Sequence, residues 1–142
     1  MKRDENHMKL YLPSLSVNES VARSVVASFV AQLNPTVEEL SDIKCAVSEA
    51  VTNSIVHGYK FEQGIIYIGV KYYSDRTVMV EIKDKGCGIE NVAQAMTPLF
   101  TTDTSGERSG MGFAVMQTFM DKLIVRSKKD EGVKILMSKQ LK

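Results

Sequence analysis

The stretch that organises the sequence is TVMVEIKDKGCGI (residues 77–89). Its first half alternates apolar and polar residues, and this period of two predicts a strand. Asp84 stands at the predicted strand end, and Gly86 and Gly88 follow it closely. Glycine allows backbone angles that a Cβ forbids, so a flat ligand can approach such a turn. A carboxylate there can accept a hydrogen bond from an exocyclic amine such as that of adenine. We interpret the stretch as the base-reading turn of a nucleotide site, although any tight turn favours Asp with Gly.

The segments around this turn predict an α+β fold. Four further segments show the alternation or composition of strands: residues 8–14, 65–73, 123–128 and 133–139. Residues 65–73 are expected to form a hairpin with the strand that ends at Asp84, and residues 123–128 with residues 133–139. Because strands and helices are segregated rather than alternating, we expect a mixed sheet with helices on one face. A length of 142 residues fits a single domain, of which we expect residues 1–7 to be loose.

Two helices are predicted by capping boxes, the first at Ser16 and Glu19 and the second at Thr36 and Glu39. The second helix is expected to run to about Gly58. Apolar residues at helical spacing predict the buried sides of three helices: Val21, Val25, Phe29 and Leu33; Ile43, Val47, Ala50, Val51, Ser54 and Ile55; and Phe113, Met116 and Met120.

Two more segments carry residues suited to nucleotide chemistry. In EAVTNSIVHG (residues 49–58), Glu49 and Asn53 are four apart and lie on one helix face, as an ordinary exposed helix pair also would. In GERSGMGF (residues 106–113), glycines open a predicted helix, whose free amides attract phosphate. Residues 91–109 have a poor pattern, and we interpret them as a mobile loop that could close over a nucleotide.

In this order, residues 49–58, 84–89 and 106–113 resemble the N, G1 and G2 boxes of the GHKL ATPase and kinase superfamily. Within it, SEAVTN, PLFTT and ERSGMGF are similar to the bacterial anti-sigma-factor serine kinases. The resemblance implies a two-layer α/β sandwich of the Bergerat type that binds ATP or ADP with Mg²⁺. It also implies a dimeric protein-serine kinase of sporulation, which inhibits a sigma factor of the sigma-F type and phosphorylates an anti-anti-sigma protein.

The same resemblance implies roles for individual residues. Asp84 would accept from the adenine amine, Asn53 would bind magnesium, and Glu49 would take the proton from the attacking serine. Arg108 would place positive charge near the γ-phosphate. The remaining nucleotide contacts would come from Gly86, Gly88, Thr101, Thr102, Gly110, Met111 and Gly112. The sequence departs from the family at Val133, where a threonine commonly follows the glycine, so we expect weaker or differently hydrated adenine binding.

Glu19 and Arg23, on the first predicted helix, would bind the protein partners according to the resemblance. Their pattern alone favours a solvated polar face. A non-catalytic nucleotide-gated switch is the alternative to a kinase, and Glu49 distinguishes the two because a switch needs no base beside the γ-phosphate. The ATP-binding domain of a histidine kinase is less favoured, since no helical hairpin with an acceptor histidine precedes the fold.

Composition narrows the partners further. A net charge of +1 with 25% charged residues argues against a broad nucleic-acid surface, so a protein or small molecule is the expected partner. Cys45 and Cys87 form no CxxC pair, which fits a reducing compartment. No signal peptide or apolar run of membrane-spanning length is present, so we expect a cytoplasmic protein.

Overall fold

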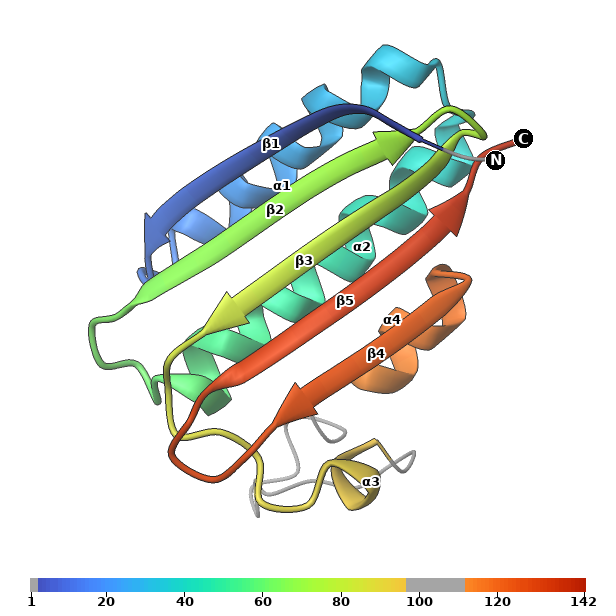
Figure 1. Cartoon of the computed structure of the whole chain (residues 1–142). Helices are drawn as coiled ribbons and strands as arrows, with labels where there is room; N and C mark the ends of the chain where they lie inside the picture. Colours follow the sequence, from blue (N-terminus) through green and yellow to red (C-terminus); the bar gives the residue numbers. More distant parts are fainter. Residues whose placement is uncertain (1–2, 97–111) are drawn as a thin grey trace.

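The computed structural model describes residues 3–96 and 112–142 and shows a five-stranded sheet with helices on one face (Figure 1). The strands are β1 (Asp4–Pro13), β2 (Ile65–Tyr73), β3 (Thr77–Asp84), β4 (Lys122–Ser127) and β5 (Val133–Gln140). Their order is β1-β2-β3-β5-β4, and each neighbouring pair is antiparallel. The predicted α+β fold is therefore confirmed, with a sheet that is antiparallel throughout the described residues rather than mixed.

The helices form the second layer of the sandwich. They are α1 (Asn18–Val30), α2 (Val37–Asn53), α3 (Val92–Ala95) and α4 (Phe113–Phe119), with a 3₁₀ turn η1 (Ala31–Leu33) and a π turn η2 (Ser54–Gly58). Behind the sheet, α1 lies along β1 and β2, α2 crosses β3 and β5, and α4 lies by β4 (Figure 1). No helix among residues 3–96 and 112–142 is long and apolar enough to cross a membrane.

The core lies between the two layers. Alternate residues of the inner strands point toward the helices and are buried, as the period of two predicted. The largest fully buried side chains are Phe113, Ile43, Ile66, Ile68, Ile82, Met116, Ile135, Met137, Val26, Val30, Val47 and Val51. The apolar sides predicted for the second and third helices are confirmed, since those residues are buried.

The expectation that residues 1–7 are loose is wrong for the described part of that segment. β1 begins at Asp4, which pairs with Tyr73 of β2. Arg3 N donates to Ser74 Oγ at 3.1 Å, and Asn6 Nδ2 donates to Tyr72 OH at 3.2 Å. Strand pairing joins backbone groups, so polar residues extend an edge strand when one of its faces meets solvent. Residues 1–2 lie outside the described part.

The capping box predicted at the start of α1 does not form. The N-cap is Val17, and no side chain caps the helix there. Glu19 instead accepts a hydrogen bond from Ser48 Oγ of α2, and its carboxylate lies 3.7 Å from Arg23 Nη1. A contact between helices has thus replaced the local contact with Ser16, because a capping motif competes with tertiary partners for the same carboxylate.

The buried side of α1 is displaced by one residue from the prediction. Val21 is 43% exposed. The fully buried residues are Ala22, Val26 and Val30, whereas Val25, Phe29 and Leu33 are half-buried. Both rows have fourfold spacing and lie side by side on the helix, so periodicity alone does not separate them. The small side chain of Ala22 lets α1 approach α2 closely.

The capping box of α2 is confirmed. Thr36 Oγ1 accepts from Glu39 N at 3.0 Å, and Glu39 Oε1 accepts from Thr36 N at 2.9 Å. Glu39 Oε2 also accepts from Lys142 N at 2.9 Å, so this carboxylate joins the helix to the end of the chain. Hydrogen bonds from the backbone, first that of Thr36 and then that of Lys142, hold the pKa of Glu39 below its ordinary 4.5.

Both ends of the chain meet the turn between β2 and β3. Arg3 O accepts from Ser74 N at 2.9 Å, and Leu141 N donates to Arg76 O at 3.0 Å. Arg76 Nε also donates to Lys142 O at 3.1 Å. Asp84, at the other end of β3, is therefore a full strand length away from the termini (Figure 1).

Candidate nucleotide site

Asp84 is a buried carboxylate held in one orientation at the end of β3. It is 2% exposed. Its Oδ1 accepts from Gly86 N at 2.9 Å and from Val133 N at 3.3 Å, and the Ser54 hydroxyl donates to the same carboxylate. Burial raises the pKa of the Asp84 carboxyl above its ordinary 3.8, while these hydrogen bonds act in the opposite direction. The acceptor is thus fixed in place before any ligand arrives.

The π turn η2 packs directly on this carboxylate. A Cβ on Gly58 would lie 2.9 Å from Asp84 Oδ2, and a Cβ on Gly86 would overlap Gly58 O. Cys87 N donates to Gly58 O at 2.9 Å. The end of the N box and the start of the G1 box therefore form one unit in which glycine is needed on both sides.

Gly88 joins the same unit to the turn between β4 and β5. Its φ is +72°, and a Cβ there would overlap Lys128 O. Ile89 N donates to Ser127 Oγ at 2.7 Å, and Asp130 N donates to Cys87 O at 2.5 Å. These contacts explain the two glycines by chain packing, and their predicted contact with a nucleotide stays a prediction.

Glu49 lies at the other end of the predicted site, against Gly112 at the start of α4. Gly112 is the N-cap of α4 with φ +73°, and a Cβ on it would lie 2.5 Å from Glu49 Oε2. A glycine is required here both for the backbone angle and for the space that the carboxylate occupies. The fold thus places Glu49 of α2, the predicted base, against the glycine that opens α4.

Asn53 lies one helical turn beyond Glu49 and is 2% exposed. Its Oδ1 is buried and accepts no hydrogen bond from the described residues. A buried acceptor without a partner lowers stability by about 1–3 kcal/mol, so such an atom is typically retained for a ligand. A neutral oxygen is suited to Mg²⁺ that also contacts phosphate oxygens. The chemistry of Asn53 therefore fits the magnesium role expected of it.

Part of the predicted site lies outside the described residues. Those predictions concern Thr101, Thr102, Arg108, Gly110 and Met111, and most of the loop predicted over residues 91–109. The described start of that loop carries α3, where Asn91 Oδ1 accepts from Gln94 N at 3.0 Å.

Two residues that support Asp84 were not predicted from the sequence. Ser54 was expected only as part of a buried helix side, yet its hydroxyl donates to Asp84. Tyr59 OH accepts from Lys85 N at 2.8 Å and donates to Ile65 O at 2.5 Å. One hydroxyl thus joins the residue after Asp84 to the start of β2. No periodicity signals such contacts, because they join segments that are distant in the sequence.

Val133, the departure from the family pattern, still takes part through its backbone. Its N–H donates to Asp84, and its side chain is buried. The position therefore retains its donor while it lacks the hydroxyl of a threonine.

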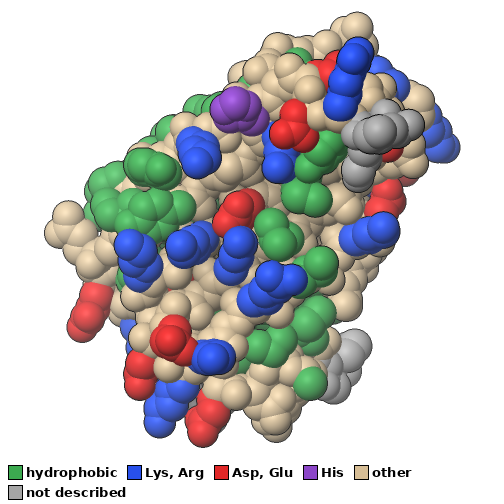
Figure 2. All heavy atoms as spheres, viewed as in Figure 1, with side chains coloured by type: hydrophobic (Ala, Val, Ile, Leu, Met, Phe, Trp, Pro, Cys, Tyr) green, Lys and Arg blue, Asp and Glu red, His purple; other side chains and the backbone are tan. Residues whose placement is uncertain are grey.

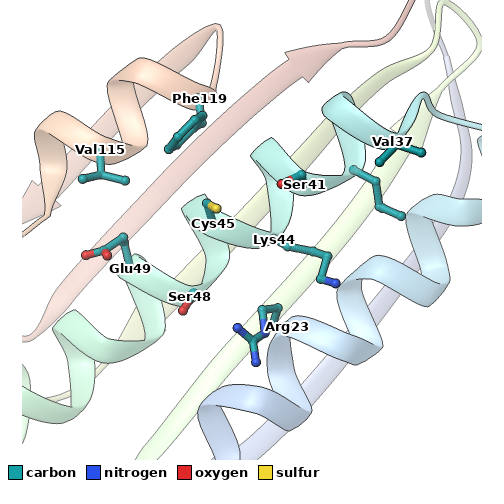
Figure 3. A pocket seen from close by; sticks show the side chains of 10 residues that line it. Arg23, Val37, Ser41, Lys44, Cys45, Ser48, Glu49, Val115 and Phe119 are labelled. Atoms are coloured by element: carbon teal, nitrogen blue, oxygen red, sulfur yellow. The ribbon is translucent and has the colours of Figure 1, made fainter.

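A groove between α1, α2 and α4 connects Glu49 with the predicted partner residue Arg23 (Figure 3). It has a volume of about 580 Å³. Its lining residues are Arg23, Val37, Leu40, Ser41, Lys44, Cys45, Ser48, Glu49, Val115 and Phe119. Arg23 keeps 39% of its side chain exposed beside Glu19, so the guanidinium remains available from solvent.

Residues 12–139 match the family model of the histidine kinase-like ATPase domain, and the chain belongs to this family. Among its relatives, the anti-sigma F factor of Clostridium novyi (strain NT) is 53% identical over 138 residues, which cover 96% of both chains. The anti-sigma F factor of Thermoanaerobacter sp. (strain X514) is 54% identical over 136 residues, which cover 96% of this chain and 94% of the relative.

Solved structures agree on the fold. The RsbU and RsbW domains of Rv1364c from Mycobacterium tuberculosis match with a TM-score of 0.71 and 16% identity, over 96% of this chain and 33% of that one. This chain thus spans about a third of that solved chain. The catalytic domain of the histidine kinase ThkA matches with a TM-score of 0.56 and 15% identity, over 96% and 97% of the two chains.

Proposed function

We propose that this protein is an ATP-dependent protein-serine kinase that also binds and inhibits a sigma factor of the sigma-F type. The observation that carries the catalytic part is the position of Glu49, beside Gly112 and one helical turn from the buried Asn53 oxygen. The names of the relatives, anti-sigma F factors at 53% and 54% identity, support the sigma factor as the bound partner.

In this mechanism each residue has one task. Asp84 orients the adenine of ATP or ADP through its fixed carboxylate. Asn53 Oδ1 would hold Mg²⁺, which when bound neutralises phosphate charge. Glu49 takes the proton from the serine hydroxyl of the anti-anti-sigma substrate as that oxygen bonds to the γ-phosphorus, and the bond from the γ-phosphorus to the bridging oxygen breaks to release ADP. Such a base typically contributes ~10²–10⁴-fold.

The groove supports a shared docking surface for the two protein partners. It leads from Arg23, which with Glu19 would contact the sigma factor and the substrate protein, to Glu49. A substrate bound at Arg23 could therefore present its serine to the base. Two partners that compete for one guanidinium would also exclude each other.

The assembly we infer is a cytoplasmic homodimer. β1 lies at the edge of the sheet and pairs, among the described strands, with β2 alone. A long edge strand readily pairs with another chain, and a second copy would cover it.

Transfer of label from [γ-³²P]ATP to the anti-anti-sigma protein tests the kinase. With Mg²⁺ present, Glu49→Gln should bind ATP as the wild type does and slow transfer by ~10²-fold or more, because an amide keeps the shape but accepts no proton. Glu62→Gln, at an exposed glutamate outside the groove, is the matched control and should transfer label normally.

Two results would change the proposal. Near-normal transfer by Glu49→Gln would assign the proton to another group. A wild-type protein that binds ATP, and captures the sigma factor only with ATP, but transfers no label to serine would be a nucleotide-gated switch. In that case Asp84 would keep its role and Glu49 would have none.

A further inference from the structure

The sheet face opposite the helices carries a row of aligned side chains that crosses the whole sheet. In order from β1 to β4, the directly paired residues are Tyr11, Tyr67, Lys83, Lys134 and Arg126. Their neighbours along each inner strand are buried against the helices, so alternation directs this row to the open face. Strand spacing of about 4.8 Å gives the row a length of roughly 19 Å.

Three of the five residues in this row are cations that face one another. Lys83 is paired with Lys134, and Lys134 with Arg126. Like charges placed directly opposite in a sheet are destabilising. One carboxylate, Glu81, lies 3.5 Å from Lys134 Nζ. Lys and Arg side chains gather across these strands in the space-filling view (Figure 2). The net charge of +1 does not reveal this cluster of cations, because it is a sum over all faces of the molecule.

The other two residues of the row, Tyr11 and Tyr67, place aromatic rings beside a hollow. The Tyr11 and Tyr67 ring centroids are 5.1 Å apart in an edge-to-face arrangement, and Tyr11 is 61% exposed. A hollow of about 180 Å³ lies over this half, lined by Lys9, Tyr11, Tyr67, Ile68, Gly69, Glu81 and Lys83. Gly69 of β2, paired with Lys9 of β1 and Glu81 of β3, lacks a side chain, so the floor of the hollow is low at this position.

We propose that this open face binds single-stranded nucleic acid. Phosphates would lie along Lys83, Lys134 and Arg126, where an anion offsets the repulsion between paired cations. A base would stack on Tyr11, the exposed ring of the pair, since every base has a flat face and aromatic platforms on an open sheet suit single strands. Tyr67 supports this ring edge-to-face, and Lys85 Nζ lies 5.1 Å from the centroid of Tyr67 and adds a cation beside it. An acidic polypeptide would also satisfy the cations but would have no use for the exposed rings, so the observations favour a nucleic acid.

The test is fluorescence anisotropy with fluorescein-labelled 12-nucleotide RNA and DNA single strands of mixed sequence, with saturating ATP and Mg²⁺ present. Three phosphate contacts predict a slope of about −2 in log affinity against log salt, or roughly 18-fold weaker binding at 200 mM than at 50 mM salt. Lys83→Gln should weaken binding and reduce the slope by about 0.7. Tyr11→Ser should weaken binding roughly tenfold and leave the slope unchanged.

Matched controls separate this surface from the rest of the molecule. Lys44→Gln removes a cation from the helical layer and should not change oligonucleotide binding. Thermal unfolding verifies that each variant is folded, and Tyr11 is exposed enough for its replacement to be tolerated.

The proposal would be overturned by the absence of saturable binding at 50 mM salt, by equal weakening in Lys44→Gln, or by self-association of the protein through the open face in place of oligonucleotide binding. Oligonucleotide binding that occurs only when ATP is left out would also overturn it, because the oligonucleotide would then occupy the nucleotide site. A labelled poly-glutamate peptide is the remaining probe. If it bound as tightly as the oligonucleotide, and Tyr11→Ser affected neither, the face would dock an acidic protein segment instead.

Discussion

Replacing Asp84 with asparagine isolates the charge of the carboxylate from its shape. The amide can keep Oδ1 against Gly86 N and Val133 N, the two donors that fix it at 2.9 and 3.3 Å. Its NH₂ group then takes the other carboxylate position and meets the adenine amine, donor against donor. A hydrogen bond to a charged group contributes ~1.5–3 kcal/mol, so ADP affinity should fall roughly 10- to 100-fold.

Calorimetric titration with ADP and with inosine diphosphate makes this test specific. Inosine diphosphate carries a carbonyl oxygen where adenine has its amine, so the new NH₂ can donate to it. Asp84→Asn should therefore reduce or reverse the preference for ADP. Asp75→Asn, in the turn between β2 and β3, removes a carboxylate far from the site and should leave both affinities unchanged.

The pH dependence of the same titration gives a second measurement. Because burial raises the pKa of Asp84 above 3.8, protonation replaces the acceptor at a higher pH than for an ordinary aspartate. Wild-type ADP affinity should thus decline as pH falls through that raised pKa, and Asp84→Asn should lack this decline. A folded Asp84→Asn protein with unchanged ADP affinity and an unchanged preference over inosine diphosphate would refute the assigned role.

Three further substitutions probe the groove, the start of α4 and the start of α2. Arg23→Ala should weaken capture of both the sigma factor and the anti-anti-sigma protein about tenfold in pull-downs, while ADP affinity stays within about twofold; undiminished capture would make Arg23 an ordinary surface charge. Gly112→Ala should slow phosphoryl transfer at least about tenfold, because its Cβ would lie 2.5 Å from Glu49 Oε2 at φ +73°. Gly69→Ala, whose Cβ has 3.9 Å to its nearest neighbour, is the control, and equal rates in both variants would contradict this reasoning. Glu39→Gln should reduce the free energy of unfolding by about 1 kcal/mol at pH 7 in urea titrations. Since the folded-state pKa of Glu39 is lowered, that difference should begin to shrink as pH falls below 4.5 and be lost as pH falls through the lowered pKa; a difference that stays constant throughout the acid titration would show another cause.

The two predicted capping boxes show what local sequence can and cannot decide. Thr36 and Glu39 form theirs because the carboxylate keeps its local partner and adds a contact to Lys142. At Ser16 the same four-residue pattern fails, because Glu19 finds Ser48 on α2. A motif of this kind predicts a helix start correctly to within a residue or two, but the side-chain contact depends on what the other helix offers.

The residues of the candidate site also fall into those that the sequence predicted and those that it did not. Period placed Asp84 at a strand end and Glu49 with Asn53 on one helix face, whereas the roles predicted for them came from the resemblance to the GHKL boxes. The supporting groups were not predicted, because Tyr59 and Ser54 reach the Asp84 turn through contacts between elements. Spacing along the chain shows which residues share a face, whereas the packing of one element on another decides which atoms meet.

The meeting of both chain ends at the turn between β2 and β3 makes the molecule suitable for circular permutation. Arg3 and Leu141 are each anchored to this turn by a backbone hydrogen bond, so a short peptide could join them. Asp84 lies at the opposite end of β3, and such a linker would not reach it. New chain ends could then be made at exposed Gln63, next to Gly64. The chain would be cut between η2 and β2, and the order of the strands in the sheet would stay the same. A reporter domain attached beside Arg3 or Leu141 would likewise leave the nucleotide end of the sandwich accessible.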